Sequence, residues 1–231
     1  MTALSPPTLE DDGRLLVVRF AAPQRTLSSA IVGGGFGRAR AVAWRFVRNA
    51  DLPPDAEPAQ LLGGWLADAG LDEAVGLLTA RDLRPFEHVI EEEGGLAARA
   101  VATVGLSNAV AAGDSPGPLI VGTINVLLQL TVPLTDAAFV EALALAAEAR
   151  TAAVLAARVP SRRSSRWASG TGTDCLVVAA PLPDDASAPE QYCGKHTLLG
   201  ALAGAAVQTA VARGAERWIA EQQTLARAGA Q

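Results

Sequence analysis

A long segment with almost no charge constrains the fold of this chain more than any other feature. From Ala100 to Thr135 the only charged side chain is that of Asp114. Such a segment predicts strands that are buried on both faces of a sheet, because a solvent-facing strand alternates apolar with polar residues. The stretch Ala112–Pro118 (AGDSPGP) predicts the turn between two such strands. We therefore expect the deep core of the protein in this segment.

The same segment contains an uncharged stretch, Ser115–Thr135, that is long enough for a membrane span. Prolines, Asn125 and Gln129 interrupt it, and a lipid-facing helix would have no water to satisfy the polar groups they introduce. The apolar stretch His196–Ala212 is shorter than the ~20 residues that a transmembrane helix needs. We therefore expect no membrane attachment.

Helical periodicity is clearest directly after the uncharged segment. Apolar residues recur at helical spacing from Thr135, a typical N-cap residue, to about Arg158, and Pro160 follows. The pattern predicts a long helix near 135–158. Further helices are predicted at 59–69 and, as two separate C-terminal helices, at 198–213 and 215–228.

Shorter apolar segments predict strands in the first part of the chain and again before residue 181. Two of them flank the glycine run Gly33–Gly37 (GGGFG), which predicts a hairpin turn. This run differs from a phosphate-binding loop, since Arg38 breaks the GxGxxG pattern and a strand, not a helix, follows. The expected strands are 14–20, 26–32, 41–47 and 175–180.

The order of these elements, with several early strands and late helices, favours an α+β fold over regular βαβ alternation. We expect a largely buried mixed or antiparallel sheet covered by helices; a layered α/β sandwich is the alternative. Neither an internal repeat nor a break in composition marks a second domain. Residues 14–231 are thus expected to form one domain after a flexible N-terminus, residues 1–13.

Composition excludes several classes of function. The net charge is -5 and only 4% of the residues are aromatic, whereas a nucleic-acid surface needs clustered basic side chains beside stacking rings. Met1–Gly13 has no signal-peptide pattern, which favours the cytoplasm. Cys175 and Cys193 have neither the number nor the spacing of a disulfide scaffold or a zinc site, so no metal is predicted.

Ser28 and Ser29 end a predicted strand just before the glycine run. Serines beside a turn commonly satisfy local backbone groups. No GxSxG motif marks either of them as a hydrolase nucleophile. Local structure is therefore the plainer interpretation, and a substrate contact is the alternative.

A second polar cluster lies within the uncharged segment, where Ser107 and Asn108 (GLSNA) are followed by Thr123 and Asn125 (GTIN). In a strand, Thr123 and Asn125 project from the same face. An amide in apolar surroundings is tolerated only when it is hydrogen-bonded. A structural network between paired strands and a substrate pocket explain this cluster about equally well.

A third cluster is the glycine-rich SGTGTD segment, which ends at Asp174 and leads into a strand. A carboxylate at such a loop end is often functional. The absence of a following helix disfavours a nucleotide P-loop. Backbone N–H groups that could form an anion nest are those of Gly170, Thr171, Gly172 and Thr173.

The segment YCGKHT contains Lys195, the only lysine of the chain, beside His196 at the start of a predicted helix. A lysine gains nothing from the helix dipole at that end, which favours anions. Either it is an inert solvated residue or its charge is used. The other histidine, His88, lies among carboxylates on what we expect to be a solvated helix, and we interpret it as structural.

Together these segments resemble the adenosylcobinamide amidohydrolase family, enzymes of cobalamin salvage. Each motif alone is unspecific, but the set occurs in family order over most of the chain. The segments that carry the resemblance are LSSAIVGGG (Leu27–Gly35), VGLLTA (Val75–Ala80), VGLSNA (Val104–Ala109), GTINVLL (Gly122–Leu128), EAR (Glu148–Arg150), SGTGTD (Ser169–Asp174) and GKHTLLG (Gly194–Gly200).

The resemblance implies hydrolysis of the amide that joins the aminopropanol arm to the corrin ring of adenosylcobinamide, giving adenosylcobyric acid. Such a reaction needs an activated water or nucleophile, donors for the oxyanion and an acid for the departing amine. We expect Asp174 or His196 to be the general base, with the other residue orienting it or protonating the amine. Lys195 would give electrostatic support, and the N–H groups of residues 170–173 would form the oxyanion hole. A Thr or Ser nucleophile stays open.

The expected substrate is itself a cobalt corrinoid, and no separate cofactor is predicted. A corrinoid-binding protein without chemistry is the alternative, and a phosphate- or nucleotide-handling enzyme is less favoured. A homo-oligomer is compatible with the sequence. The expected substrate-binding residues are Ser28, Ser29, Ser107, Asn108, Thr123, Asn125, Gly170, Thr171, Gly172, Thr173 and Thr197.

Overall fold

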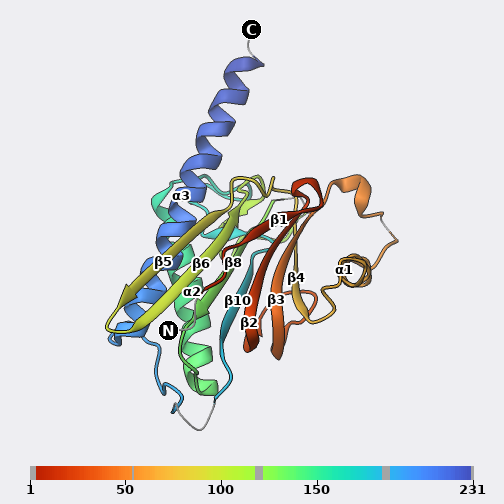
Figure 1. Ribbon diagram of the computed structural model, residues 1–231. Coiled ribbons are helices and arrows are strands. Elements are labelled where there is room, and N and C mark those ends of the chain that lie inside the picture. The colour runs from red at the N-terminus through yellow and green to blue at the C-terminus, as the bar shows by residue number, and fades with distance from the viewer. Residues whose placement is uncertain (1–3, 54, 118–121, 184–187, 230–231) are drawn as a thin grey trace.

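The structure is a computed structural model that describes the chain except residues 1–3, 54, 118–121, 184–187 and 230–231. Within the described residues the fold is α+β, as predicted, with a mixed eight-stranded sheet and α-helices on its outer faces (Figure 1). The helices are α1 (Pro58–Asp68), α2 (Asp136–Ala156) and α3 (Leu198–Ala228), with short 3-10 turns at Asp11–Gly13 and Asn49–Asp51. The strands are β1 (Thr8–Glu10), β2 (Leu15–Ser28), β3 (Gly35–Phe46), β4 (Ala74–Thr79), β5 (Glu87–Glu93), β6 (Leu96–Val104), β7 (Ala109–Val110), β8 (Ile124–Leu130), β9 (Gly170–Thr171) and β10 (Cys175–Pro181).

The large sheet has the strand order β4-β3-β2-β10-β8-β6-β5, and β1 pairs with β2. β10 runs parallel to β8, and β3 runs parallel to β4. The remaining pairs in the large sheet are antiparallel, including the predicted β2-β3 hairpin around the glycine run. β7 and β9 form a separate antiparallel pair.

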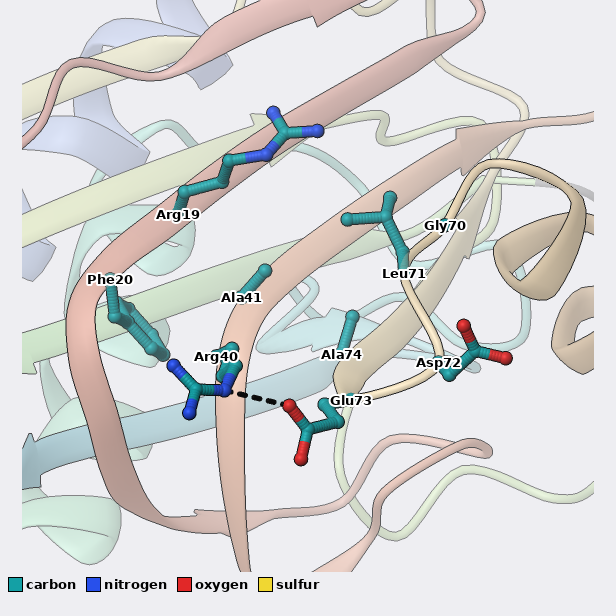
Figure 2. A pocket seen from close by; sticks show the side chains of 9 residues that line it. All are labelled: Arg19, Phe20, Arg40, Ala41, Gly70, Leu71, Asp72, Glu73 and Ala74. Atoms are coloured by element: carbon teal, nitrogen blue, oxygen red, sulfur yellow. Dashed lines mark ion pairs between the residues drawn. The ribbon is translucent and has the colours of Figure 1, made fainter.

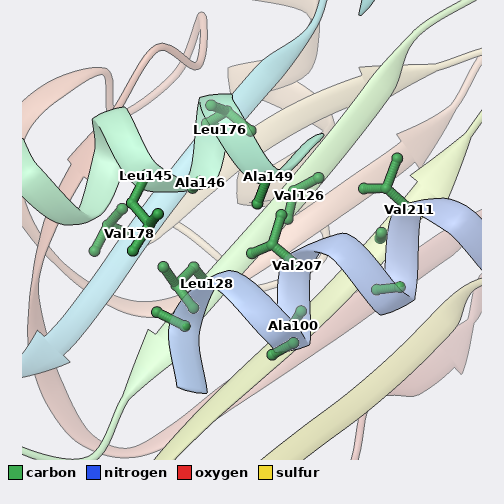
Figure 3. Close-up of a cluster of buried hydrophobic side chains, with 14 of the residues drawn as sticks. Ala100, Val126, Leu128, Leu145, Ala146, Ala149, Leu176, Val178, Val207 and Val211 are labelled. Atoms are coloured by element: carbon green, nitrogen blue, oxygen red, sulfur yellow. The ribbon is translucent and has the colours of Figure 1, made fainter. Parts of the chain in front are cut away.

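The helices cover the two halves of the sheet from opposite sides (Figure 1). α2 and α3 pack against β5, β6, β8 and β10 through alanine and branched aliphatic side chains (Figure 3). α1 packs on the other half, where Leu62 and Leu66 lie against β4 and share an apolar cluster with the outer side of β2 and β3. The inner faces of the halves meet in another apolar cluster, which includes Trp44, Val101 and Leu127. The layers are therefore helix, sheet, sheet and helix.

The central strand β8 confirms the expectation drawn from the uncharged segment, because all of its residues are buried. Successive side chains of a strand point to opposite faces. Val126 and Leu128 accordingly join the cluster under α2 and α3, while Leu127 joins the inner cluster. Asn125 and Gln129 share the face of Leu127, so this strand brings two amides to the interior between the sheet halves.

The long helix predicted near 135–158 is confirmed as α2. Thr135 is its N-cap, and the Thr135 hydroxyl oxygen accepts a hydrogen bond from the Ala138 N–H (3.2 Å). Such a cap satisfies one of the free N–H groups at a helix start.

The prediction of two C-terminal helices is wrong, because α3 runs unbroken through Gly214. A Cβ atom at this position would lie only 2.5 Å from the Cγ2 atom of Val104 on β6. Gly214 therefore provides a close approach between helix and sheet. A glycine inside a helical pattern can therefore mark a close packing contact and not a helix end.

Three smaller expectations also change. Thr8–Glu10 pairs with β2, so this part of the N-terminus is a strand and not a flexible end. The strands predicted at 14–20 and 26–32 are one long strand, whose register shifts between Arg19 and Gln24. His88 lies in β5, a strand at the edge of the sheet, and not on a solvated helix.

In the described part of the chain one helix, α3, has the length and composition of a membrane span. More than half of its most apolar window, 56%, is buried inside the protein. Such burial is typical of a helix in a protein core, and the contacts of α3 with β5 and β6 account for its apolar side chains.

Candidate functional site

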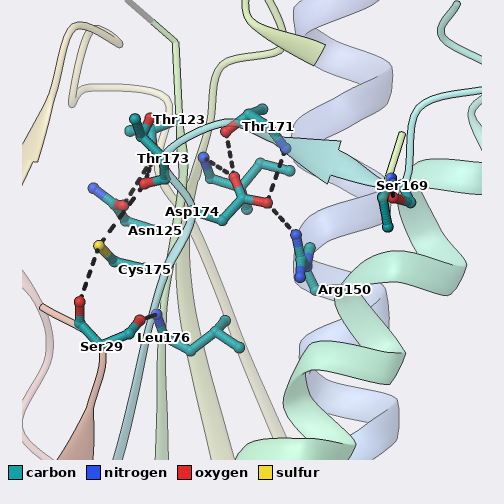
Figure 4. A network of polar contacts seen from close by, with 12 residues as sticks. Ser29, Thr123, Asn125, Arg150, Ser169, Thr171, Thr173, Asp174, Cys175 and Leu176 are labelled. Atoms are coloured by element: carbon teal, nitrogen blue, oxygen red, sulfur yellow. Dashed lines mark hydrogen bonds and ion pairs between the residues drawn. The ribbon is translucent and has the colours of Figure 1, made fainter. Parts of the chain in front are cut away.

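The structure brings the GTIN and SGTGTD segments together, because β8 and β10 are parallel neighbours. Asn125 of β8 is the register partner of Cys175 at the start of β10. The loop before each strand therefore reaches the same edge of the sheet, where the polar side chains form one network (Figure 4). Sequence separation hid this contact, since Asn125 and Asp174 are far apart in the chain.

Asp174 is the centre of this network, and its side chain is only 8% exposed. One carboxylate oxygen accepts from the Ile124 N–H (3.0 Å) and from the Thr171 hydroxyl. The other accepts from the Thr171 N–H (2.9 Å) and forms an ion pair with Arg150 of α2. A carboxylate offers about four acceptor positions. All of them are used, so this arrangement orients the loop and leaves no lone pair for a water.

Thr123 and Asn125 form the second part of the network. The Thr123 hydroxyl lies 2.7 Å from the Thr173 carbonyl oxygen and 3.2 Å from Oδ1 of Asn125, both acceptors. The Asn125 amide nitrogen donates to the Leu78 carbonyl (2.8 Å), which ties β8 to β4 across the interior. Asn125 is fully buried. Its role in the structure is therefore a bridge between the sheet halves.

A cavity of about 220 Å³ opens beside this network. Most of its wall is apolar and comes from β4, from the segment before β3 and from the start of α1. Its polar side chains are those of Thr79, Thr123, Thr173 and Cys175. Ligand sites commonly combine an apolar wall with a few placed polar groups. This makes the cavity the candidate for the substrate amide.

Ser107 and Asn108 lie behind the same edge. Asn108 is buried, and its carbonyl accepts from the Gly172 N–H (3.3 Å). Gly122 has a φ of +144°, and a Cβ atom there would collide with the Ser107 hydroxyl. Only glycine fits such a position. Ser107 and Asn108 thus pack against the loops that carry the network.

Some of the backbone N–H groups expected to form the oxyanion hole are already hydrogen-bonded within the protein. The N–H of Thr171 binds Asp174, and the N–H of Gly172 binds Asn108. Gly170 lies against Arg150 so closely that a side chain at that position would collide with it. Residues 170–172 therefore hold the loop in shape.

Ser28 has the local role of the plainer interpretation, whereas Ser29 bonds to a strand that is distant in the sequence. The Ser28 hydroxyl oxygen accepts from the Ala30 N–H (2.9 Å). The Ser29 hydroxyl oxygen accepts from the Leu176 N–H (3.2 Å), which joins the end of β2 to β10.

The structure does not bring YCGKHT to this network. Lys195 pairs with Glu148 of α2 at 2.6 Å, and both side chains are more than half exposed. Glu148 and Arg150 are two residues apart, which places them about 200° apart around the helix axis. Lys195 and Asp174 therefore contact opposite sides of α2. His196 is exposed, its expected pairing with Asp174 is not among the described contacts, and its role stays a prediction.

Thr197 is the N-cap of α3. Its hydroxyl donates to the Gly194 carbonyl (2.8 Å) and accepts from the Gly200 N–H (3.0 Å). These bonds explain its place in the GKHTLLG segment.

Sequence reasoning named no role for Arg150 and none for Cys175. Arg150 lies in the EAR segment, and the family resemblance of that segment was the sequence signal that could have indicated a role for it. Cys175 lines the cavity, and burial, together with the charge of Asp174, raises the pKa of its thiol. A raised pKa leaves the thiol protonated and weakly nucleophilic at neutral pH.

Two further findings bear on the site. No group of His, Cys, Asp and Glu side chains suited to a metal ion occurs among the described residues.

A separate cavity of about 350 Å³ lies near β2 and β3 (Figure 2), where Arg40 pairs with Glu73. Both partners of that ion pair are mostly exposed, and the residues of the predicted site do not line the cavity.

Comparison with known protein families identifies both the class and the family of the chain. It is a hydrolase with an α+β fold. It belongs to the adenosylcobinamide amidohydrolase family, whose sequence model matches residues 5–223. A comparison with curated proteins finds no match.

Solved structures similar to this chain include the following two. The PH0078 protein of Pyrococcus horikoshii OT3 has a TM-score of 0.48 and 11% identity, over 93% of this chain and 82% of that chain. The L-aminopeptidase D-Ala-esterase/amidase of Ochrobactrum anthropi has a TM-score of 0.41 and 12% identity, over 90% of this chain and 81% of that chain.

Proposed function

We propose that the protein hydrolyses the amide between the aminopropanol arm and the corrin ring of adenosylcobinamide, releasing aminopropanol and adenosylcobyric acid for cobalamin salvage. Family membership supports the amidohydrolase chemistry. The observation that carries the assignment of the site is the convergence of the GTIN and SGTGTD segments on one cavity. Hydroxyl groups from both segments face that cavity beside the buried Asp174–Arg150 pair.

In this proposal the arm enters the cavity of about 220 Å³ while the corrin ring stays outside, because the ring is far larger than the cavity. Thr123 is the hydroxyl that contacts the reacting amide. It is held in place by Asn125 and by the Thr173 carbonyl. Asp174 acts through the loop it fixes and is a positioning residue.

Two ways of attack agree with this geometry. In the first, the Thr123 hydroxyl oxygen attacks the amide carbonyl, the C–N bond breaks, the hydroxyl proton passes to the nitrogen of the departing aminopropanol, and water then hydrolyses the resulting ester to the acid. In the second, Thr123 holds the water that attacks the carbonyl, and a proton of that water passes to the departing nitrogen. A covalent acyl-enzyme can be intercepted by hydroxylamine as a hydroxamate of the corrinoid acid, whereas direct attack by water gives only the acid. This measurement separates the two routes.

The activity test is incubation of the purified full chain with adenosylcobinamide, followed by detection of free aminopropanol. We expect Thr123→Ala to lower turnover by ~10²-fold or more and Thr123→Ser to retain most of it, since serine keeps the hydroxyl. Thr224→Ala, at an exposed position of α3, is the matched control and should turn over as wild type.

Two results would contradict the proposal. A folded wild-type protein that binds adenosylcobinamide without releasing aminopropanol would be a corrinoid-binding protein. Full activity in folded Thr123→Ala would remove that residue from the reaction. His196→Ala and Lys195→Met, made in parallel, test the remaining predicted roles; loss of turnover in folded His196→Ala would restore it as the base.

The phosphate-handling alternative loses support. The Gly33–Gly37 run joins β2 to β3, and the SGTGTD loop leads into β10. Neither loop precedes a helix, so neither has the helix N-terminus that phosphate loops use.

We also infer that the reaction needs no metal beyond the cobalt of the substrate. Turnover should survive dialysis against a chelator. A loss that a divalent metal ion restores would contradict this inference.

A further inference from the structure

Asn108 lies on the loop between β6 and β7 and is only 6% exposed. Its backbone carbonyl accepts from the Gly172 N–H, but its side-chain amide forms no hydrogen bond with the described residues. Both the oxygen and the nitrogen of that amide keep some solvent-accessible surface. A side chain this buried normally hydrogen-bonds within the protein. The amide of Asn108 is instead left for a partner from outside.

A cavity of about 250 Å³ lies at this amide, and both Asn108 and Gly172 line it. The amide nitrogen of Asn108 lies beside Gly172, since a Cβ atom added to that glycine would be 2.9 Å from it. The volume far exceeds the ~10–15 Å³ that one water molecule needs. The cavity therefore has room for a group of several atoms at the Asn108 amide.

The rest of the wall favours a neutral group over an ion. It carries one acidic and one basic side chain, Asp114 and Arg163, so the formal charges cancel. Asp114 is engaged within the protein, because it accepts from the Ala111 N–H (2.8 Å) and pairs with Arg166 at 2.6 Å. The buried polar group of this wall that lacks a partner is thus the amide of Asn108.

We propose that this cavity binds a primary carboxamide that projects from the periphery of the corrin ring; the inference rests on the proposed function. A primary amide offers N–H donors and a carbonyl acceptor. The N–H of the ligand donates to Oδ1 of Asn108, and its carbonyl accepts from Nδ2. A carboxylate would bring no donor for Oδ1, and an ammonium group would bring no acceptor for Nδ2.

The position of the cavity allows one ligand to reach both sites. Gly172 lines this cavity, and Thr173 lines the candidate hydrolase cavity. The Cα atoms of neighbouring residues are about 3.8 Å apart, so the two cavities adjoin the same loop. The corrin ring lies across that loop, with the aminopropanol arm in one cavity and an amide arm in the other. Asn108 is therefore a residue that selects the ring and does not touch the reacting amide.

The test is equilibrium dialysis of the purified full chain with adenosylcobyric acid, which keeps the ring and its peripheral amides and is not consumed. We expect Asn108→Leu to bind it about tenfold more weakly or worse, because the ligand amide loses both hydrogen bonds. The same variant should raise KM for adenosylcobinamide by a similar factor and leave kcat near wild type. Its Tm without ligand should equal that of wild type, since no bond within the protein is lost. Gln223→Leu removes an exposed amide of α3 and is the matched control for all three measurements.

Asn108→Asp is a second variant, which keeps the shape and an acceptor but loses the donor. It should also weaken binding, since its carboxylate repels the carbonyl oxygen of the ligand. Weaker binding by both variants supports the inference even if wild type releases no aminopropanol, a result that would contradict the proposed function alone. Wild-type affinity in folded Asn108→Leu would overturn the inference even if aminopropanol is released. Tighter binding by Asn108→Asp, a lower Tm for Asn108→Leu than for Gln223→Leu, or no binding by wild type would overturn it as well.

Discussion

The two ends of β8 each carry a buried amide side chain, but the polar networks that these two amides join differ. Asn125 and Gln129 are both buried and point to the same inner face. Asn125 donates to the Leu78 carbonyl and accepts from Thr123, beside an Asp174 whose four acceptor positions are filled. Gln129 binds Arg99, whose Nε remains without a partner.

The two networks differ in their counter-charges. Arg150 and Arg99 each have an Nε without a partner, but Arg150 forms an ion pair with Asp174, whereas Arg99 forms none with a carboxylate of the described residues. A buried charge without a counter-charge is costly. The Asn125 end is thus suited to hold a reactive hydroxyl in place, whereas the Gln129 end carries a charge that the fold does not compensate.

The largest effect is expected in the Asp174 network, for Arg150→Met. Removing one partner of a buried ion pair leaves an uncompensated charge, here on Asp174, and lowers the free energy of unfolding by about 3–5 kcal/mol. Urea unfolding measures this loss. Lys195→Met is the matched control on the opposite side of α2, because its partner Glu148 is exposed and such pairs contribute about 0–1 kcal/mol. Equal losses in both variants would mean that Asp174 is not held as described.

A direct contrast of the two ends comes next. Asn125→Leu leaves the Leu78 carbonyl without its hydrogen-bond donor and should lower the free energy of unfolding by about 1–3 kcal/mol. Arg99→Met should be nearly neutral or stabilising, since it replaces a buried charge by an apolar side chain. Urea unfolding of both variants measures the two changes. If Arg99→Met is as destabilising as Asn125→Leu, Arg99 stabilises the fold without a counter-charge and the comparison fails.

The outer face of the same strands gives a third comparison, because it is apolar and closed. Gly214→Ala places a methyl group 2.5 Å from Val104, and such overpacking costs about 1–3 kcal/mol, against a gain in helix propensity of up to about 1 kcal/mol. In Gly204→Ala the new methyl group lies 3.7 Å from Leu145, an ordinary contact, so only the gain remains. Thermal unfolding should show opposite signs. A rise in Tm for Gly214→Ala would show that α3 can move away from β6.

Much of the fold could be predicted because the relevant signals are local. The uncharged segment identified buried strands, and Thr135 marked the start of α2. Gly214 shows the limit, since a glycine alone does not distinguish a helix break from a close contact. The difference was decided by Val104, which is distant in the sequence.

The site shows a similar division. Residue types indicated Thr123, Asn125 and Asp174, and strand pairing then brought them together. Sequence could not show that Asp174 is saturated, because its partners Ile124 and Arg150 come from other elements. Nor could it place Lys195 on the far side of α2, since that depends on the path of the chain between β10 and α3.

His88 gives the smallest expected effect and extends the comparison to β5. It is half-buried on the inner face, and its Nε2 has no partner. Burial, and then the charge of Arg99, lowers the pKa of His88 below its usual value of about 6.5. The unfolded chain therefore binds the proton more readily, so the stabilising contribution is present above pH ~6.5 and is lost as the pH falls through the lower pKa of the folded state. Thermal unfolding between pH 7.5 and 5 should show a smaller fall in Tm for His88→Gln than for wild type. Parallel curves for wild type and His88→Gln would show that this imidazole feels neither burial nor Arg99.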